Sequence, residues 1–259
     1  MARRGIDQGQ SIPGPIRSRW MYDTDNPTVA GNSRREFESE LFRWSPRLRC
    51  DEFTDFTPGT ALPAGWSSEI TKTAGTPTVT VLANTANGVL QAALDATNEL
   101  QYAGVDCCNQ KVIPATQWPY FEARVQVPTA LTSVQDVIIG LGTSYASPIG
   151  SIAKYVRFRL NGNMNVLVEG NDGTNTITLQ AAARGTTVLA AGQFYLFSID
   201  LHDLSKVKFW IDDAHVAVLN LAAFAATDLL QPLIGIQKTS GTTTPTLQAD
   251  TARCMWNRI

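Results

Sequence analysis

The feature that most constrains the fold is an alternating run enclosed by two prolines, residues 118–128 (WPYFEARVQVP). Apolar residues at 121, 123, 125 and 127 alternate with polar residues at 122, 124 and 126. A period of two places all the apolar side chains on one face of a strand. Pro119 and Pro128 stand at the ends, where a missing N–H does not interrupt the ladder. We therefore expect a central strand of an antiparallel sheet at Phe121–Val127.

Short runs of the same kind fill the chain on both sides of this strand. Asn87-Gly88 between two alternating runs predicts a hairpin. Residues 222–230 suit a short helix or an irregular loop. About fourteen short strands with frequent turn signals predict an all-β sandwich and exclude a βαβ fold. The strands are expected at 77–83, 89–94, 100–105, 121–127, 137–141, 155–160, 165–169, 176–180, 194–201, 206–211, 215–219, 233–236, 246–249 and 253–256.

The first fifty residues differ from the rest in composition and charge. Glycine and proline recur through them and break regular structure, yet two Trp and two Phe are present. They hold nine of the fifteen Arg and no Lys, so the segment is +3 and the remainder −5. Forked arginine contacts favour a fixed partner over diffuse attraction. We expect an extended arm over residues 1–50 that docks on an acidic neighbour, with a solvated tail as the plain alternative.

The number and spacing of the cysteines and histidines indicate whether a metal site is expected and in which cellular compartment the chain is made. The chain has four Cys and two His and lacks a C-x-x-C motif, so we expect no zinc site and no disulfide framework. We see no signal peptide and no long apolar run, which indicates synthesis in a reducing cytoplasm and no membrane segment. A net charge of −2 argues against a nucleic-acid partner.

Two histidines and three tryptophans are the remaining candidates for metal binding or for stacking on sugar rings. His202 and His215 are expected to be satisfied surface histidines, with a metal site beside Asp as the less favoured alternative. Aromatic residues of a sandwich mostly pack in its core or rim, although they can also stack on sugar rings. Three tryptophans are open to both interpretations: Trp118, Trp210 and Trp256.

Three stretches together resemble the concanavalin A-like lectin and glucanase jelly roll. Residues 53–66 hold a spaced Phe-Phe pair followed by L-P-x-G-W, and residues 120–125 (YFEARV) resemble the F-E-A-R strand of laminarinase-type glucanases. Residues 247–253 (LQADTAR) resemble their closing strand, in which an Asp precedes an Arg. The resemblance covers residues 51–259, and it implies a jelly-roll β-sandwich of two curved antiparallel sheets whose concave face can hold a carbohydrate.

The acids that such glucanases use are missing from the matching place. Their next strand carries E-x-D-x-x-E, and retaining hydrolysis needs two carboxylates about 5–5.5 Å apart. The run taken as its counterpart here, Gln135–Gly142 (QDVIIGLG), has one acid, and Asp212-Asp213 lies at a turn. Asp250 matches a position that helps bind calcium in some glucanases, but one ligand does not predict a metal site. We therefore expect no enzyme, no catalytic residues and no cofactor.

Low charge, an aromatic Arg-rich arm and a W-N-R ending resemble virion proteins of tailed bacteriophages. We therefore expect a capsid decoration (cement) protein of the virion, a homo-oligomer such as a trimer, whose arm binds the major capsid protein or other virion proteins. The alternatives are a tail or head-fibre adhesin that binds host-surface glycans and, second, a glycan hydrolase. The residues expected to bind the partner are Arg3, Arg4, Trp20, Arg34, Arg35, Phe37, Arg43 and Trp44.

Overall fold

The computed structural model describes residues 61–82, 88–107, 113–129, 131–162, 164–181 and 189–257, together with the backbone of one earlier strand, Leu48–Thr54. Contacts divide the chain into two units, Met1–Arg49 and Cys50–Ile259. The expected arm lies outside the described residues, apart from the backbone of 48–50. All that follows concerns the second unit.

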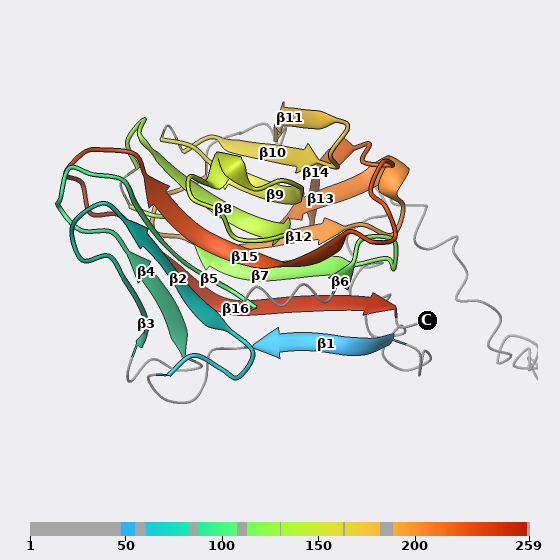
Figure 1. Cartoon of the computed structure of the whole chain (residues 1–259), viewed down its shortest axis with the longest axis horizontal. Helices are drawn as coiled ribbons and strands as arrows, with labels where there is room; N and C mark the ends of the chain where they lie inside the picture. The colour runs from blue at the N-terminus through green and yellow to red at the C-terminus, as the bar shows by residue number, and fades with distance from the viewer. Residues whose placement is uncertain are drawn as a thin grey trace, which may run out of the picture. The chain divides into compact units, whose positions relative to one another are not determined.

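Two antiparallel sheets make up the described part of the chain (Figure 1). Sheet A contains, in spatial order, β14 (Ala214–Leu219), β13 (Val207–Ile211), β12 (Phe194–Asp200), β7 (Tyr120–Gln126), β16 (Thr246–Asn257), β4 (Val89–Ala93) and β3 (Thr78–Leu82), with β1 (Leu48–Thr54) beside β16. Sheet B contains β11 (Thr176–Gln180), β10 (Val166–Asn171), β9 (Tyr155–Leu160), β8 (Gln135–Gly142), β15 (Leu229–Lys238), β5 (Gln101–Asp106) and β2 (Ser67–Lys72), with β6 (Ile113–Pro114) beside β15.

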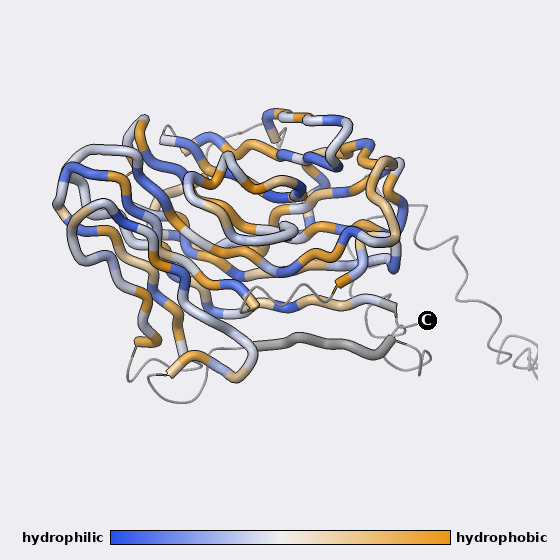
Figure 2. Tube along the Cα trace, in the orientation of Figure 1, coloured by the Kyte–Doolittle hydropathy of each residue, from blue (hydrophilic) through white to orange (hydrophobic). Residues whose placement is uncertain are grey.

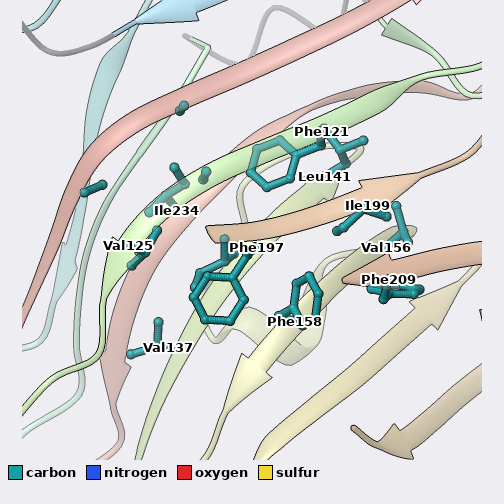
Figure 3. Packing of buried hydrophobic residues seen from close by; sticks show 14 of the residues in the cluster. Phe121, Val125, Val137, Leu141, Val156, Phe158, Phe197, Ile199, Phe209 and Ile234 are labelled. Atoms are coloured by element: carbon teal, nitrogen blue, oxygen red, sulfur yellow. The ribbon is translucent and has the colours of Figure 1, made fainter. Parts of the chain in front are cut away.

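Alternation along the strands builds the core between these sheets, and Figure 2 shows it as changes of hydropathy along each strand. Phe121, Ala123 and Val125 of β7 are at most 1% exposed, so the apolar face predicted for this strand is confirmed. Phe158 of sheet B packs edge-on against two rings of sheet A, Phe197 at 5.1 Å and Phe209 at 5.2 Å between centroids (Figure 3). Offset and edge-on ring contacts add to the burial that holds the layers together.

The predicted strands are found with small shifts of their ends, and the two-sheet antiparallel sandwich is confirmed. The two strands expected at 246–249 and 253–256 form one strand, β16, because a bulge between Ala249 and Thr251 lets the ladder continue. Residues 222–228 form turns that lead into β15. The described residues contain no helix that is long and apolar enough to cross a membrane.

The strand β2 was not predicted. Its sequence, SSEITK, lacks an apolar face, and no residue of it is fully buried because it is an edge strand of sheet B. Periodicity identifies strands by the side chains that they bury in the core, so a polar edge strand gives no such signal. This strand supplies part of the candidate site.

Candidate functional site on the outer face of sheet B

Two acidic side chains lie together on the face of sheet B that points away from the core. Glu69 comes from β2, and Asp106 comes from the end of the neighbouring strand β5. Ser67 pairs with Asp106 across the two strands and lies two residues before Glu69, so all three side chains share one face. We call Glu69 and Asp106 the acid pair.

A single hydroxyl links the acid pair. Ser67 Oγ lies 2.7 Å from Asp106 Oδ1 and 3.3 Å from Glu69 Oε1. Because both oxygens are within reach of one atom, they can be no more than about 6 Å apart. Gln231 of β15 donates a further hydrogen bond of 3.2 Å from Nε2 to Asp106 Oδ2. Among the described residues, neither carboxylate forms an ion pair.

The surroundings of the acid pair raise the pKa of Glu69. Burial, and then the charge of Asp106, raise the pKa of Glu69 above its ordinary value, while the Ser67 hydrogen bond lowers it. Glu69 is half-buried and Asp106 is fully buried. Glu69 is thus the carboxyl whose surroundings favour its protonated form more than in water.

Tyr102 adds a buried hydroxyl to this site. Its side chain is 0% exposed, and its hydroxyl has no hydrogen-bond partner among the described residues. The hydroxyl lies over Gly104 and Gly235, where an added Cβ would collide with it. Gly104 and Gly235 are register partners on β5 and β15, so the hydroxyl lies over the junction of these two strands, beside the strand that carries Asp106. Leaving a buried hydroxyl unpaired costs about 1–3 kcal/mol, which points to a ligand or water that completes the site.

Apolar and aromatic side chains border the acid pair. Tyr145 packs on Tyr102 with ring centroids 4.6 Å apart and hydrogen-bonds Thr71 of β2 through its hydroxyl. Ile149 and Ile152, from the segment between β8 and β9, join Tyr102 in a second apolar cluster on this face. The site therefore combines carboxylates, hydroxyls and aromatic rings.

A second group of charges lies on β8, β9 and β10 of the same face, and we call it the Arg–Glu cluster: Arg157, Arg159, Glu169 and Asp136. Arg157 contacts Glu169 Oε2 with two nitrogens, Nε at 2.9 Å and Nη2 at 2.8 Å. Arg159 Nε contacts the other carboxylate oxygen, Glu169 Oε1, at 2.7 Å. Arg159 Nη1 also lies 3.3 Å from Asp136 Oδ1. Two positive and two negative charges are thus matched within the cluster.

The run 135–142, examined for the glucanase acids, contributes Asp136 to this cluster. The structure therefore confirms that a tight acid pair is absent from that strand. It also shows what sequence spacing missed, because the acids that do meet are separated by 37 positions and lie on different strands. Residues 67–72 (SSEITK) hold one acid and no apolar alternation, so the sequence carries no local signal for this pair.

The other predicted site residues have varied positions. The eight arm residues, from Arg3 to Trp44, lie outside the described residues. Trp210 and Trp256 are buried, as the packing interpretation predicts, whereas Trp118 is 52% exposed. Asp250 forms an ion pair with Arg124 at the bulge of β16. Among the described residues, no group of three or more His, Cys, Asp or Glu is placed to hold a metal ion.

Comparison with known proteins identifies the fold. No family model and no curated sequence matches the chain. A GH16 enzyme of Bacteroides ovatus, solved with a mixed-linkage glucan product, has a TM-score of 0.58 at 11% identity, over 78% of this chain and 98% of that one. The laminarinase catalytic domain of Thermotoga maritima has a TM-score of 0.55 at 14% identity, over 82% and 98%. A protein of unknown function from Shewanella oneidensis has a TM-score of 0.54 at 15% identity, over 88% and 94%.

These similarities correct one expectation and confirm another. The concanavalin A-like jelly roll is confirmed. The expectation that the chain is no enzyme is wrong to take the missing acids of one strand as decisive, because solved structures of the same fold include an endo-glucanase and a laminarinase catalytic domain.

Proposed function

We propose that this concanavalin A-like jelly roll binds glycans through the outer face of sheet B, with the acid pair at the centre of the site. The observation that carries the proposal is the acid pair itself, together with the Tyr102 hydroxyl that lacks a partner among the described residues. Glu69 is the partly exposed member of the pair and can accept hydrogen bonds from sugar hydroxyls, while the buried Asp106 and Tyr102 lie behind it. Solved structures of the same fold hold glucan fragments, including a variant of LamA from Z. galactanivorans with laminaritriose and laminaritetraose.

The test is binding of the full chain to an array of β-glucans and bacterial surface polysaccharides. Glu69→Gln and Asp106→Asn should each weaken binding to the retained glycan at least tenfold, since each removes a charged acceptor. Asp250→Asn is the matched control, because it makes the same chemical change in sheet A. Equal binding by all four proteins would contradict the proposal.

Glycan hydrolysis is a second candidate, favoured by the raised pKa of Glu69 beside Asp106. Glycosidases use two nearby carboxyl groups, one of which has a raised pKa and acts as the general acid. The full burial of Asp106 places binding first, since a nucleophile must reach the sugar. Release of reducing sugar from laminarin or mixed-linkage glucan, lost in Glu69→Gln, would establish the activity. A wild-type protein that binds these polymers and leaves them intact would exclude it for them.

We also propose that the chain works in a bacteriophage virion, as a decoration protein or a fibre adhesin, held by residues 1–50. The support is the sequence: nine arginines, no lysine and several aromatic residues in one segment. Arginine forks pair with carboxylates of a partner, and aromatic side chains fill its pockets. Deleting residues 1–47 leaves β1 intact and should abolish incorporation into particles. Unchanged occupancy of particles would refute this role of the arm.

A further inference from the structure

Trp118 stands out from the other described tryptophans by its exposure and its backbone. Trp66, Trp210 and Trp256 are 6–7% exposed, whereas Trp118 is 52% exposed. Its φ is +54°, in the left-handed region that a bulky residue rarely adopts. It also precedes Pro119, and a following proline disfavours helical backbone. Such strain costs about 1–3 kcal/mol and tends to persist where function requires the side chain in place.

A histidine supports one side of the Trp118 ring. The centroids of Trp118 and His202 are 4.7 Å apart at an angle of 43°. The backbone fixes this contact, because Leu201 N donates a 2.8 Å hydrogen bond to Pro119 O, and Tyr120 pairs with Asp200 across the strands. Burial lowers the pKa of His202, against the carboxylates of Asp200 and Asp203, which raise it. We call these two rings, which meet in a tilted contact, the Trp118 platform.

The charges around the platform balance. Asp200 pairs in register with Lys208 on the neighbouring strand, and Asp203 interacts with Lys206. His202 lies within electrostatic range of Asp200, Asp203 and Lys208. The two acids and two lysines around the platform carry no net charge. They offer hydrogen-bond donors and acceptors but do not favour a charged ligand of either sign. A partner for this site is neutral, with one apolar face and a polar rim.

We propose that the Trp118 platform is a second carbohydrate site, at which a neutral pyranose ring stacks on the exposed indole. A pyranose has the required chemistry, because its axial C–H groups form an apolar face and its hydroxyls surround it. Tryptophan gives a rigid stacking surface whose ordering costs little entropy. The site belongs to the end of β7 in sheet A, whereas the acid pair belongs to sheet B. It shares only the ligand class with the proposed function and does not depend on that site.

The experiment compares the full chain with Trp118→Ala, Glu69→Gln and the double variant. Each is titrated with laminari-, cello-, chito- and maltohexaose at up to millimolar concentration, followed by tryptophan fluorescence. Trp118→Ala should remove the fluorescence response and weaken binding at the platform at least tenfold, while Glu69→Gln should keep the response. Leu179→Ala, which truncates an exposed apolar side chain on sheet B, away from the platform on sheet A, is the control and should behave as wild type.

A chemical readout guards against a variant that merely misfolds. N-bromosuccinimide should oxidise Trp118 before the buried Trp66, Trp210 and Trp256, as peptide mass spectrometry can show, and a bound hexaose should slow the oxidation of Trp118. A hexaose response that Trp118→Ala leaves unchanged would overturn the platform, as would no saturable response to any hexaose. Loss of binding in Glu69→Gln alone would support the site on sheet B and overturn the platform. Loss of binding in Trp118→Ala alone would support the platform and count against the site on sheet B.

Discussion

The Arg–Glu cluster and the acid pair occupy the same face of sheet B but are built in opposite ways. In the cluster, every charge has an opposite charge within 3.3 Å. In the acid pair, two acidic side chains share one hydroxyl, an amide bonds Asp106 alone, and Tyr102 adds a hydroxyl without a partner among the described residues. The first arrangement satisfies its buried groups within the protein. The second arrangement leaves hydrogen-bonding groups that a ligand from outside the protein can use.

This contrast separates a structural role from a functional one. Arg157 also donates a 2.9 Å hydrogen bond to Ile149 O and lies 3.9 Å above the Tyr155 ring, so the cluster ties the β8–β9 segment to the sheet. A matched cluster of this kind is expected to matter for stability and little for binding. Unmatched acids are expected to cost stability and to support function.

The largest effect is expected from Glu169→Ala. It would leave the Arg157 guanidinium buried without its carboxylate, and breaking a buried pair from one side costs about 3–5 kcal/mol. Urea denaturation measures the loss. The control is Arg124→Ala, which removes a half-exposed ion pair with Asp250 and should cost less than about 1 kcal/mol. Similar losses in the two variants would mean that the cluster is not the structural element we describe.

A smaller change of opposite sign is expected from Tyr102→Phe. Removing a buried hydroxyl that lacks a partner should stabilise the fold by about 1 kcal/mol, since the desolvated group no longer has to be accommodated. Glycan binding at the acid pair should weaken in the same variant. Tyr145→Phe is the control: it removes a bonded hydroxyl and should destabilise by about 1 kcal/mol. Destabilisation by Tyr102→Phe would show that its hydroxyl is already satisfied.

The two regions also differ in how far the sequence reveals them. The strand YVRFRL alternates strictly, so its position and its buried face at Val156 and Phe158 follow from periodicity. Pairing of Arg157 with Glu169 depends on the register of β9 and β10, which the Asn-Gly-Asn turn between them favours. The acid pair depends on β2 lying beside β5, a contact between strands that residues 73–100 separate. No local pattern encodes that neighbourhood, and only the packed sandwich brings the two acids together.

A direct test of like-charge coupling is the pKa of Glu69 itself. Asp106→Asn removes the neighbouring charge while keeping an oxygen for the Ser67 hydroxyl, so the pKa of Glu69 should fall towards its ordinary value. Carbon-13 NMR of the labelled side-chain carboxyl follows the titration. Ser67→Ala should move the pKa the other way, because the Ser67 hydrogen bond lowers it. An unchanged titration in both variants would mean that the two carboxyls do not interact.

The smallest effect is expected in the pH dependence of stability. A carboxyl whose pKa is raised by folding binds more protons in the folded state than in the unfolded state, so its ionisation costs stability as pH rises above 4.5, its ordinary pKa. Glu69→Gln cannot ionise and should therefore match wild type at low pH and become slightly more stable at pH 7. We expect a difference below about 1 kcal/mol, because solvent screens a half-exposed group. Urea denaturation of both proteins from pH 4 to pH 8 measures it, and a wild type that gains stability over Glu69→Gln with rising pH would show that Glu69 has a favourable partner instead of an acidic one.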